Sequence, residues 1–453
     1  MINKLQIPPI IEKFATRLNN AGHECWLVGG AIRDLLNNVK KISDFDFATD
    51  ARPEQVNKIY KHVIPTGIKH GTVTVLYQGT NMEVTTFRTE TDYIDGRHPN
   101  KLMYSKNIKE DLSRRDFTIN GIALNIITGE ILDPFGGISD IKLGIIRTIG
   151  KPHERFSEDG LRLFRACRFA AQLKFQIHEP TLIAIRDCLS TARHVSKERI
   201  KKELEGVLLS NQPSIGLKLL RKTGLIEYIF PKLNNYTEKI IDHSNSFSQF
   251  DHCIKTCDAT PINLLIRLAT LFHNANKSRN MPTNDNLISK KAPVSAKEAY
   301  RTLKRLRFSN VICTQISQII KFDSFKYDIP WSDAAIRQLI AQVGIQQTSN
   351  IFLLHQASHY SLNNNTETLK HFEKTQDQIK LISSQNNAST IKDLAINGDE
   401  VMKYFNLKQG PIIGQILTEL INRVIENPSL NYNAKLLQMT NDYLVTLEKK
   451  PTS

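Results

Sequence analysis

The chain contains 453 residues, more than one hydrophobic core usually supports, so we expect at least two domains. Its formal charge of +15 at pH 7 favours a polyanionic partner, most often nucleic acid, because Lys and Arg neutralise phosphates. No run of about 18 apolar residues occurs, which excludes a membrane-spanning helix. Six scattered cysteines and the lack of a signal-peptide pattern indicate a reduced, cytoplasmic protein.

The first 150 residues predict a mixed α/β unit. Strands are predicted at 26–28, 44–48, 72–77, 82–88, 122–127 and 130–132, where segments are apolar or alternate polar with apolar residues. Helices are predicted at 31–36 and at 53–60, where Pro53 suits a first helical turn. The polar segment 89–110, which contains Asp95-Gly96-Arg97, is predicted to be a long exposed loop.

From Ser157 onward the strand signals give way to helical ones. Ser157 is a favourable N-cap, and Glu158 and Asp159 suit a first turn, so one helix is predicted from there to about residue 174. Further helices are predicted at 179–190, 196–209, 213–223, 261–273, 296–306, 310–321, 333–343, 366–383, 398–405, 411–426 and 433–448. The expected fold is an α/β head followed by an all-helical remainder.

A pair of carboxylates follows a glycine turn in the head. Asp44 and Asp46 are two residues apart on a predicted strand and therefore point to the same face, where Mg²⁺ would offset their repulsion. Gly29-Gly30 ends the preceding strand, which lets backbone N–H groups approach a triphosphate, and Arg33 can reach the same phosphates. Alone, the glycines indicate only a turn and the carboxylates a solvated strand face. Together they indicate a metal–phosphate site.

The motifs of the chain resemble those of the class II tRNA nucleotidyltransferases and the bacterial poly(A) polymerases. They are LVGGAIRDLL at 27–36, DFDF at 44–47, RRDFTIN at 114–120, DPFGG at 133–137, EDGLR at 158–162, DLAING at 393–398 and QGPIIG at 409–414. The resemblance spans nearly the whole chain. It implies a nucleotidyltransferase head at 1–150, a nucleotide-selecting neck at 151–210, a helical body at 211–345 and a helical, tRNA-binding tail at 346–453.

The same resemblance implies roles for residues of the head. Asp44 and Asp46 would hold two Mg²⁺ ions, one activating the RNA 3′-hydroxyl and the other steadying the triphosphate. Glu83 would be a third carboxylate beside them, although an outward-facing strand glutamate explains it as well. Arg115, followed by Asp116 in the same nucleotide-binding motif, would contact the triphosphate or the ribose, and a solvated basic patch is the alternative.

In the neck, the motif of Glu158, Asp159 and Arg162 would select the incoming nucleotide. A carboxylate accepts from the amino group shared by cytosine and adenine, and a guanidinium donates to ring nitrogens or the carbonyl. Asp159 and Arg162, one turn apart on the predicted helix, would supply both functions, so that uracil and guanine meet mismatched groups. Arg165 would approach phosphate, while Arg168 would brace the head–neck junction or reach phosphate; a solvated basic face explains these two almost as well.

Two further segments bear on the activity. In the resembled family, a flexible loop such as 89–105 accompanies the switch from CTP to ATP, and enzymes that add only cytidines are shortened there. Its length here favours terminal adenosine addition, without separating CCA addition from A addition. Relatives often carry a His-Asp-Ile-Gly-Lys phosphohydrolase signature, but Asn274 replaces the ligating Asp after His273, so we expect a degenerate stretch and no second active site.

The function predicted from the sequence is addition of CCA, from CTP and ATP, to the 3′ end of tRNA gripped by its acceptor arm. An A-adding enzyme or a poly(A) polymerase is the alternative within the same enzyme class. A catalytically inactive RNA-binding protein is the alternative from another class. The unremarkable sequence of the last residues, LEKKPTS at 447–453, argues against a poly(A) polymerase, which usually ends in a strongly basic tail.

Overall fold

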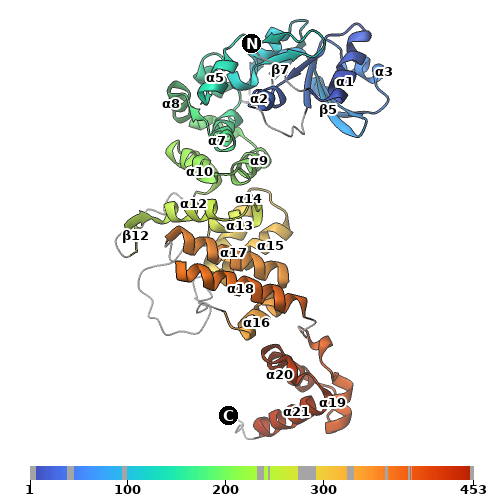
Figure 1. Ribbon diagram of the computed structural model, residues 1–453, viewed down its shortest axis with the longest axis vertical. Coiled ribbons are helices and arrows are strands. Elements are labelled where there is room, and N and C mark those ends of the chain that lie inside the picture. The colour runs from blue at the N-terminus through green and yellow to red at the C-terminus, as the bar shows by residue number, and fades with distance from the viewer. Residues whose placement is uncertain are drawn as a thin grey trace. The chain divides into compact units, whose positions relative to one another are not determined.

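The computed structural model describes residues 7–37, 45–93, 99–231, 239–242, 245–273, 292–323, 331–362, 366–385, 388 and 390–448. The chain folds into two compact units, Met1–Asn235 and Tyr236–Ser453 (Figure 1). The first unit contains a mixed sheet with helices and the second is mostly helical, which confirms the predicted fold class. No helix within the described residues is long and apolar enough to cross a membrane.

A seven-stranded sheet forms the core of the first unit, in the order β3-β4-β5-β2-β1-β8-β9. Its strands are β1 (Trp26–Val28), β2 (Phe45–Thr49), β3 (Val63–Gly67), β4 (Thr72–Tyr77), β5 (Thr80–Thr86), β8 (Ala123–Asn125) and β9 (Ile131–Leu132). Only the β2–β5 pair among them is parallel. The helices of this part are α1 (Pro9–Asn20), α2 (Gly30–Leu36), α3 (Pro53–Ile59), α4 (Ile108–Ser113) and α5 (Gly137–Leu143).

Strand β2 begins with the alternation that its sequence predicts, although Ala48 and Thr49 at its end are both buried. Phe45 and Phe47 are buried, while Asp46 between them is partly exposed, so the carboxylate faces away from the core. Phe47 packs against Phe14 of α1 with ring centroids 4.7 Å apart, and Phe14 stacks on Tyr60 at 4.6 Å. This aromatic cluster fixes α1 to the sheet and gives β2 a rigid support for its carboxylate.

The segment predicted as a long exposed loop is largely ordered. Residues Arg88–Tyr93 form β6 and Pro99–Tyr104 form β7, an antiparallel ribbon separate from the main sheet, and α4 follows. The prediction missed this ribbon because its strands carry polar residues and lack the apolar alternation of a half-buried strand. Asp95 and Arg97 lie outside the described residues.

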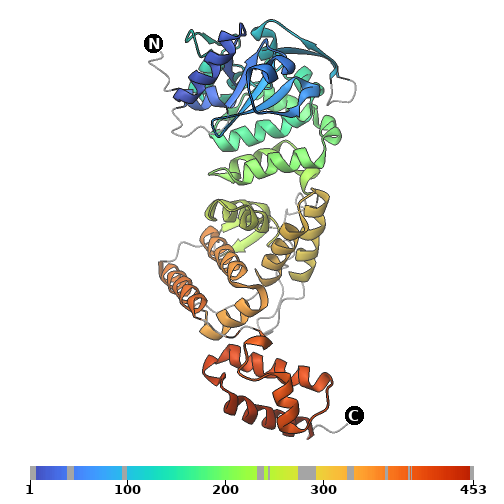
Figure 2. The ribbon, with the colours of Figure 1, turned by 90° about the vertical axis from the view of Figure 1, so that its right-hand side faces the viewer.

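Helices after residue 150 complete the first unit. They are α6 (Pro152–Glu158), α7 (Leu161–Leu173), α8 (Glu179–Asp187), α9 (Lys197–Leu208), α10 (Pro213–Lys222) and α11 (Ile226–Ile229). Helix α7 packs against α9 and α10, and Figure 2 shows these green helices beside the blue and cyan head. A two-stranded parallel pair, β10 (Ile145–Ile146) with β11 (Gln176–Ile177), joins the segments before and after α7.

The single helix predicted from Ser157 to about residue 174 is wrong. Ser157 lies inside α6, which ends at Glu158, and α7 begins only at Leu161. The chain leaves helical geometry at Asp159, with φ −146° and ψ 105°, and at the next residue, Gly160, a Cβ atom would lie 2.4 Å from the carbonyl oxygen of Thr191. The backbone at this position is pressed against a neighbouring turn, and only glycine fits there.

The second unit is built from helices and one short hairpin. They are β12 (Lys239–Asp242), β13 (Asn245–Ser248), α12 (Gln249–Ala259), α13 (Leu264–Thr270), α14 (Ala292–Arg305), α15 (Asn310–Asp323), α16 (Asp333–Val343), α17 (Ile345–Leu362), α18 (Thr366–Ser384), α19 (Gly398–Phe405), α20 (Pro411–Glu426) and α21 (Asn433–Glu448). The bounds of the last three helices, α19, α20 and α21, agree with the prediction. The predicted boundaries at residues 150, 210 and 345 stay predictions.

Candidate active site

Three groups of the head converge where β1 meets α2. Gly29 has φ 70° and ψ −135°, a conformation that disfavours other residues. A Cβ atom at Gly29 would lie 3.3 Å from both Arg115 Nη1 and Asp46 Oδ2. The glycine therefore makes room for a carboxylate and a guanidinium on either side of the turn. This arrangement brings together the predicted glycine turn, one predicted metal ligand and one predicted phosphate contact.

Two carboxylates lie side by side on this face of the sheet. Asp46 on β2 pairs in register with Glu83 on the parallel strand β5, so the two side chains project to the same face. Glu83 is exposed and Asp46 partly exposed. Asp44 lies outside the described residues, and among those residues no three His, Cys, Asp or Glu side chains gather as a metal site. The two hard oxygen ligands present are of the type that Mg²⁺ prefers.

Arg33 and Arg115 are each held by the protein itself. Arg33 donates from Nε to Asp34 at 2.9 Å and from Nη1 to Asn120 at 3.0 Å. Arg115 donates from Nη2 to Asp111 at 3.0 Å. Because each guanidinium carries five N–H groups, these contacts orient the side chain and leave further donors for phosphate oxygens.

Asp111 is an anchor that the sequence did not reveal. It is fully buried on α4 and also accepts from Arg114 at 2.7 Å. Burial alone would raise its pKa, but the charges of Arg115 and Arg114 and their hydrogen bonds lower the pKa below its usual value. An acidic residue three and four positions before paired arginines is the signal that marks it.

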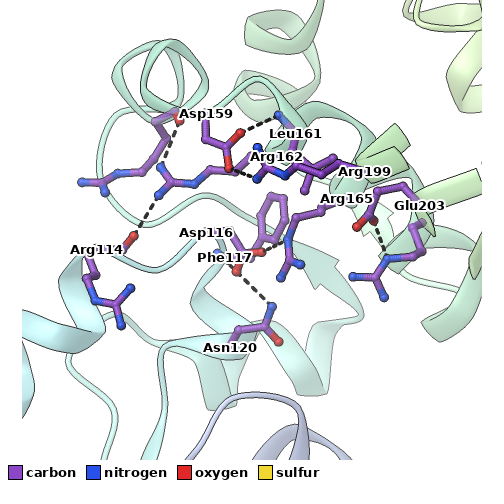
Figure 3. Close-up of polar contacts among 12 residues, drawn as sticks. Arg114, Asp116, Phe117, Asn120, Asp159, Leu161, Arg162, Arg165, Arg199 and Glu203 are labelled. Atoms are coloured by element: carbon purple, nitrogen blue, oxygen red, sulfur yellow. Dashed lines mark hydrogen bonds and ion pairs between the residues drawn. The ribbon is translucent and has the colours of Figure 1, made fainter. Parts of the chain in front are cut away.

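Asp116 is buried and serves as an internal anchor. Its carboxylate accepts from the backbone N–H of Phe117 at 2.8 Å, from Asn120 Nδ2 at 3.0 Å and from Arg165 Nε at 2.6 Å (Figure 3). With all three donors supplied by the protein, Asp116 shapes the site through its neighbours, where the sequence motif predicted a nucleotide-binding residue. It ties the head to α7 of the neck.

Asp159 and Arg162 are not arranged as predicted. Asp159 lies in the break between α6 and α7 rather than on the same helix as Arg162, so the expectation of one shared helical face is wrong. Arg162 is buried and donates to Glu158 at 2.5 Å, to the carbonyl of Arg155 at 3.0 Å and to the carbonyl of Arg114 at 3.0 Å.

Asp159 has partners from α7 and α9. It accepts from the backbone N–H of Leu161 at 3.0 Å and from Arg199 Nη2 at 2.7 Å (Figure 3). The two proposed base-reading groups are thus held by different parts of the neck. Sequence reasoning missed Arg199 because it lies 40 positions along the chain from its partner.

Arg165 and Arg168 divide their contacts differently from the prediction. Arg165 is bonded to the head through Asp116, while Arg168 pairs within the neck, with Glu203 of α9 at 2.6 Å. Arg165 therefore bonds the neck to the head, as Arg162 does through the carbonyl of Arg114, whereas Arg168 is bonded within the neck.

Phe169 gathers three arginines around one ring. The Cζ atom of Arg168 lies 4.1 Å from the ring centroid, that of Arg165 lies 5.2 Å away and that of Arg33 lies 5.3 Å away. The ring is 4% exposed and meets Phe117 edge-on at 5.8 Å. Attraction between guanidinium groups and the ring face offsets the mutual repulsion of three cations in one place. Sequence reasoning missed Phe169, which the apolar spacing of α7 marks only as core.

Comparison with known proteins identifies the family. The Poly A polymerase head domain model matches residues 25–147, the model of the "Probable RNA and SrmB- binding site of polymerase A" matches 174–237, and that of tRNA nucleotidyltransferase domain 2 matches 287–440. The CCA-adding enzyme of Limosilactobacillus reuteri is 32% identical over 96% of this chain and 97% of its own length. The chain belongs to the CCA-adding enzymes.

Other members of the family extend this result. The CCA-adding enzyme of Enterococcus faecalis is 32% identical over 93% of this chain and 92% of its own length. The crystal structure of the Bacillus stearothermophilus CCA-adding enzyme in complex with CTP aligns with a TM-score of 0.75 and 27% identity. That alignment covers 98% of this chain and 100% of the other. This CCA-adding enzyme is accordingly a nucleotidyltransferase, as the sequence predicted.

The stretch predicted to be a degenerate phosphohydrolase motif lies in the second unit of this CCA-adding enzyme. His273 is buried, and its Nε2 lies 3.1 Å from Nε2 of His252, while Ser361 Oγ lies 2.9 Å from Nδ1 of His252. Asn274 lies outside the described residues. The expectation that no second activity resides here stays a prediction.

Proposed function

We propose that this enzyme completes tRNA in the cytoplasm by adding C, C and A, from CTP and ATP, to the 3′ end without a nucleic-acid template. The observation that carries the proposal is the joining, within one unit, of the head site at Gly29, Asp46 and Arg115 to the neck groups Asp159 and Arg162. Similarity to CCA-adding enzymes over nearly the whole chain supports it.

Asp44 and Asp46 would hold two Mg²⁺ ions, with Glu83 beside them. When bound, such a pair of ions favours ionisation of the attacking 3′-hydroxyl and neutralises charge on the leaving pyrophosphate. Arg33 and Arg115 would bind the triphosphate from the other side of the glycine turn. Their anchors, Asn120 and Asp111, are in place before substrate arrives, so little conformational entropy is lost on binding.

Base selection is assigned to the neck. Asp159 would accept from the exocyclic amino group of cytosine or adenine, and Arg162 would donate to the adjoining ring nitrogen or carbonyl. The three hydrogen bonds of Arg162 use three of its five N–H groups, so donors remain for a base edge. Glu158 holds Arg162 in that orientation. Uracil and guanine would leave these groups unpaired, which costs about 1–3 kcal/mol for each.

The helical body and tail would bind the acceptor arm of tRNA. A net charge of +15 supports contact with the phosphate backbone, and duplex RNA is recognised mainly by shape and backbone. The family model of a polymerase RNA-binding site at 174–237 supports an RNA contact beginning in the neck.

One assay tests the proposal. The purified protein is incubated with Mg²⁺, labelled CTP or ATP, and tRNAs that end at the discriminator base, at C or at CC. We expect two C and one A to be added, after which synthesis stops. Addition of A only to the CC-ending tRNA would indicate an A-adding enzyme, and unlimited addition of A a poly(A) polymerase. Failure in every lane would leave an inactive RNA-binding protein and overturn the proposal.

The arginine cluster around Phe169 gives a second test. Phe169→Leu keeps an apolar side chain but removes the ring face, and since each cation–π contact is worth about 0.5–2 kcal/mol, we expect the KM for CTP and ATP to rise about tenfold. Phe169→Tyr keeps the ring and should stay within about twofold of the parent. The KM for tRNA serves as the internal control. Equal kinetics for the two variants would contradict this role of the ring.

A further inference from the structure

The direction of the Asp159 side chain depends on its contacts with neighbouring groups. Its backbone is extended, with φ −146° and ψ 105°, and it lies after the last residue of α6 and before the first residue of α7. No helical geometry therefore fixes where its side chain points. Its Oδ1 atom accepts a hydrogen bond from the N–H of Leu161. The position of Oδ2 is set by other groups.

Arg199 is the charged group that holds Oδ2. Its Nη2 lies 2.7 Å from Asp159 Oδ2, and the two side chains are 27% and 19% exposed. Arg199 lies in the first turn of α9, whose N-cap Ser196 accepts from the backbone N–H of Arg199. The Nη1 atom of Arg199 is buried and makes no hydrogen bond with the described residues. The ion pair and the partial burial of Arg199 therefore hold its guanidinium beside the Asp159 carboxylate.

Helix α9 has a second contact on the same face. Glu203, one turn after Arg199, pairs with Arg168 at 2.6 Å, and Gly206, three residues further, makes room for the stem of Arg168. A Cβ atom at Gly206 would lie 2.3 Å from Arg168 Cδ. One face of α9 thus contacts two groups of the proposed site. Arg199 contacts the carboxylate of the proposed base reader, and Glu203 contacts the cluster of arginines around Phe169 (Figure 3).

We propose that Arg199 is a positioning residue for base selection, which aims the Asp159 carboxylate at the exocyclic amino group of the incoming cytosine or adenine. The inference rests on the proposed role of Asp159 as the base reader. Without the guanidinium, the carboxylate rotates about its χ torsions and meets cytosine and uracil in several orientations. The amino group of the correct base then lacks an aligned acceptor. The wrong base no longer meets a fixed, mismatched carboxylate, so the energetic cost that excludes it falls.

Arg162 does not replace Arg199 in this task. Its hydrogen bonds run to Glu158 and to two backbone carbonyls, while those of Asp159 run to Leu161 and Arg199. Removing Arg199 therefore takes away a charged partner of Asp159 and leaves the contacts that orient Arg162 intact. We therefore expect a lower selectivity for the correct base, in addition to any loss of rate.

The test compares Arg199→Met with the parent in the ratio of kcat/KM for CTP to that for UTP, on tRNA ending at the discriminator base. Methionine keeps much of the stem and removes the charge. We expect the ratio to fall about tenfold, a typical size for coupling between contacting residues. Arg199→Lys keeps a positive charge without the planar fork and should fall in between. Arg193→Met removes an exposed arginine of the same neck and should leave the ratio unchanged.

Two further variants separate the inference from the function on which it rests. Asp159→Ala should lower the same ratio, and Arg199→Met added to it should lower the ratio no further, because Arg199 acts through that carboxylate. Glu203→Gln should raise the KM for CTP and leave the ratio unchanged, because it acts on Arg168. An unchanged ratio in Asp159→Ala would overturn Asp159 as the base reader. If the ratio falls in Asp159→Ala but not in Arg199→Met, only the inference about Arg199 is overturned. The same holds if the decreases of the two single variants add in the double variant.

Discussion

Asp46→Ala is expected to lower the rate of nucleotide addition by about a thousandfold or more, while the affinity for tRNA stays within about twofold. One positioned electrostatic group at a reacting centre is worth about 10²–10³ in kcat, and a metal ligand carries at least that much. Asp46 faces away from the core beside Glu83, so alanine leaves the packing of Phe45 and Phe47 undisturbed. Asp44→Ala is expected to behave in the same way.

Single-turnover addition of CTP to tRNA measures the rate, and a filter-binding titration measures the affinity. Asp46→Asn keeps the shape but not the charge and should be nearly as inactive, because a neutral amide is a poor ligand for Mg²⁺. Asp50→Asn is the matched control. Asp50 follows the same strand, where it accepts from the backbone N–H of Glu24 at 2.8 Å, and its removal should cost little activity. A parallel loss of tRNA affinity in Asp46→Ala would contradict a role confined to the metal.

The strands of the main sheet other than β3, and the last three described helices, could be predicted from local sequence. Strand 26–28 and helices 398–405, 411–426 and 433–448 have the predicted bounds, because apolar runs, glycine turns and caps are local signals. Helix α19, for example, begins at an Asn397 cap that is reciprocated by Glu400.

Helix α17, in contrast, was missed. It spans Ile345–Leu362 and carries polar residues such as Gln347, Thr348 and Asn350 on buried positions. With polar residues inside, its sequence lacks the apolar stripe by which a helix is recognised. Packing against α12, α15 and α16 holds it in place, and such tertiary contacts override local propensity.

The site was predicted as a set of residues but not as a set of contacts. Spacing singled out Gly29 and Asp46, and the resemblance to the family singled out Arg115 and the neck motif, because short-range patterns carry both signals. The partners that orient these groups, including Asp111, Phe169 and Arg199, lie on other elements or read as ordinary core and surface. The predicted helical face of Asp159 and Arg162 failed for a related reason, since the chain leaves helical geometry at Asp159, where the adjoining Gly160 packs against the distant Thr191 carbonyl.

Asp116 carries the largest expected effect on stability. Burial alone would raise its pKa, but the charge of Arg165 and the hydrogen bonds from Asn120 and Arg165 outweigh burial and lower the pKa to about 2. The ordinary value is 3.8, so the difference corresponds to roughly 2–3 kcal/mol in favour of the folded, ionised form. Removing one partner of a buried ion pair costs about 3–5 kcal/mol, because the other charge stays buried alone.

Asp116→Asn is therefore expected to destabilise the first unit by about 3 kcal/mol. The chain has two tryptophans, Trp26 in the first unit and Trp331 in the second, so a Trp331→Phe background makes Trp26 fluorescence report unfolding of the first unit alone. Urea titrations of the two proteins in that background give the difference. Glu154→Gln, which removes only an exposed pair with Lys151, is the control and should leave the unfolding midpoint unchanged.

The dependence on pH separates an ion pair from simple loss of packing. Because the folded pKa of Asp116 is lowered, its contribution is fully present above the unfolded pKa and is lost as the pH falls through the folded value. The difference in unfolding free energy between parent and Asp116→Asn should be constant from about pH 8 to about pH 5 and should shrink below about pH 4. A difference that persists undiminished at about pH 2 would mean that asparagine disturbs the packing of Phe117 and Asn120, and that the charge of Asp116 is not what joins the head to α7.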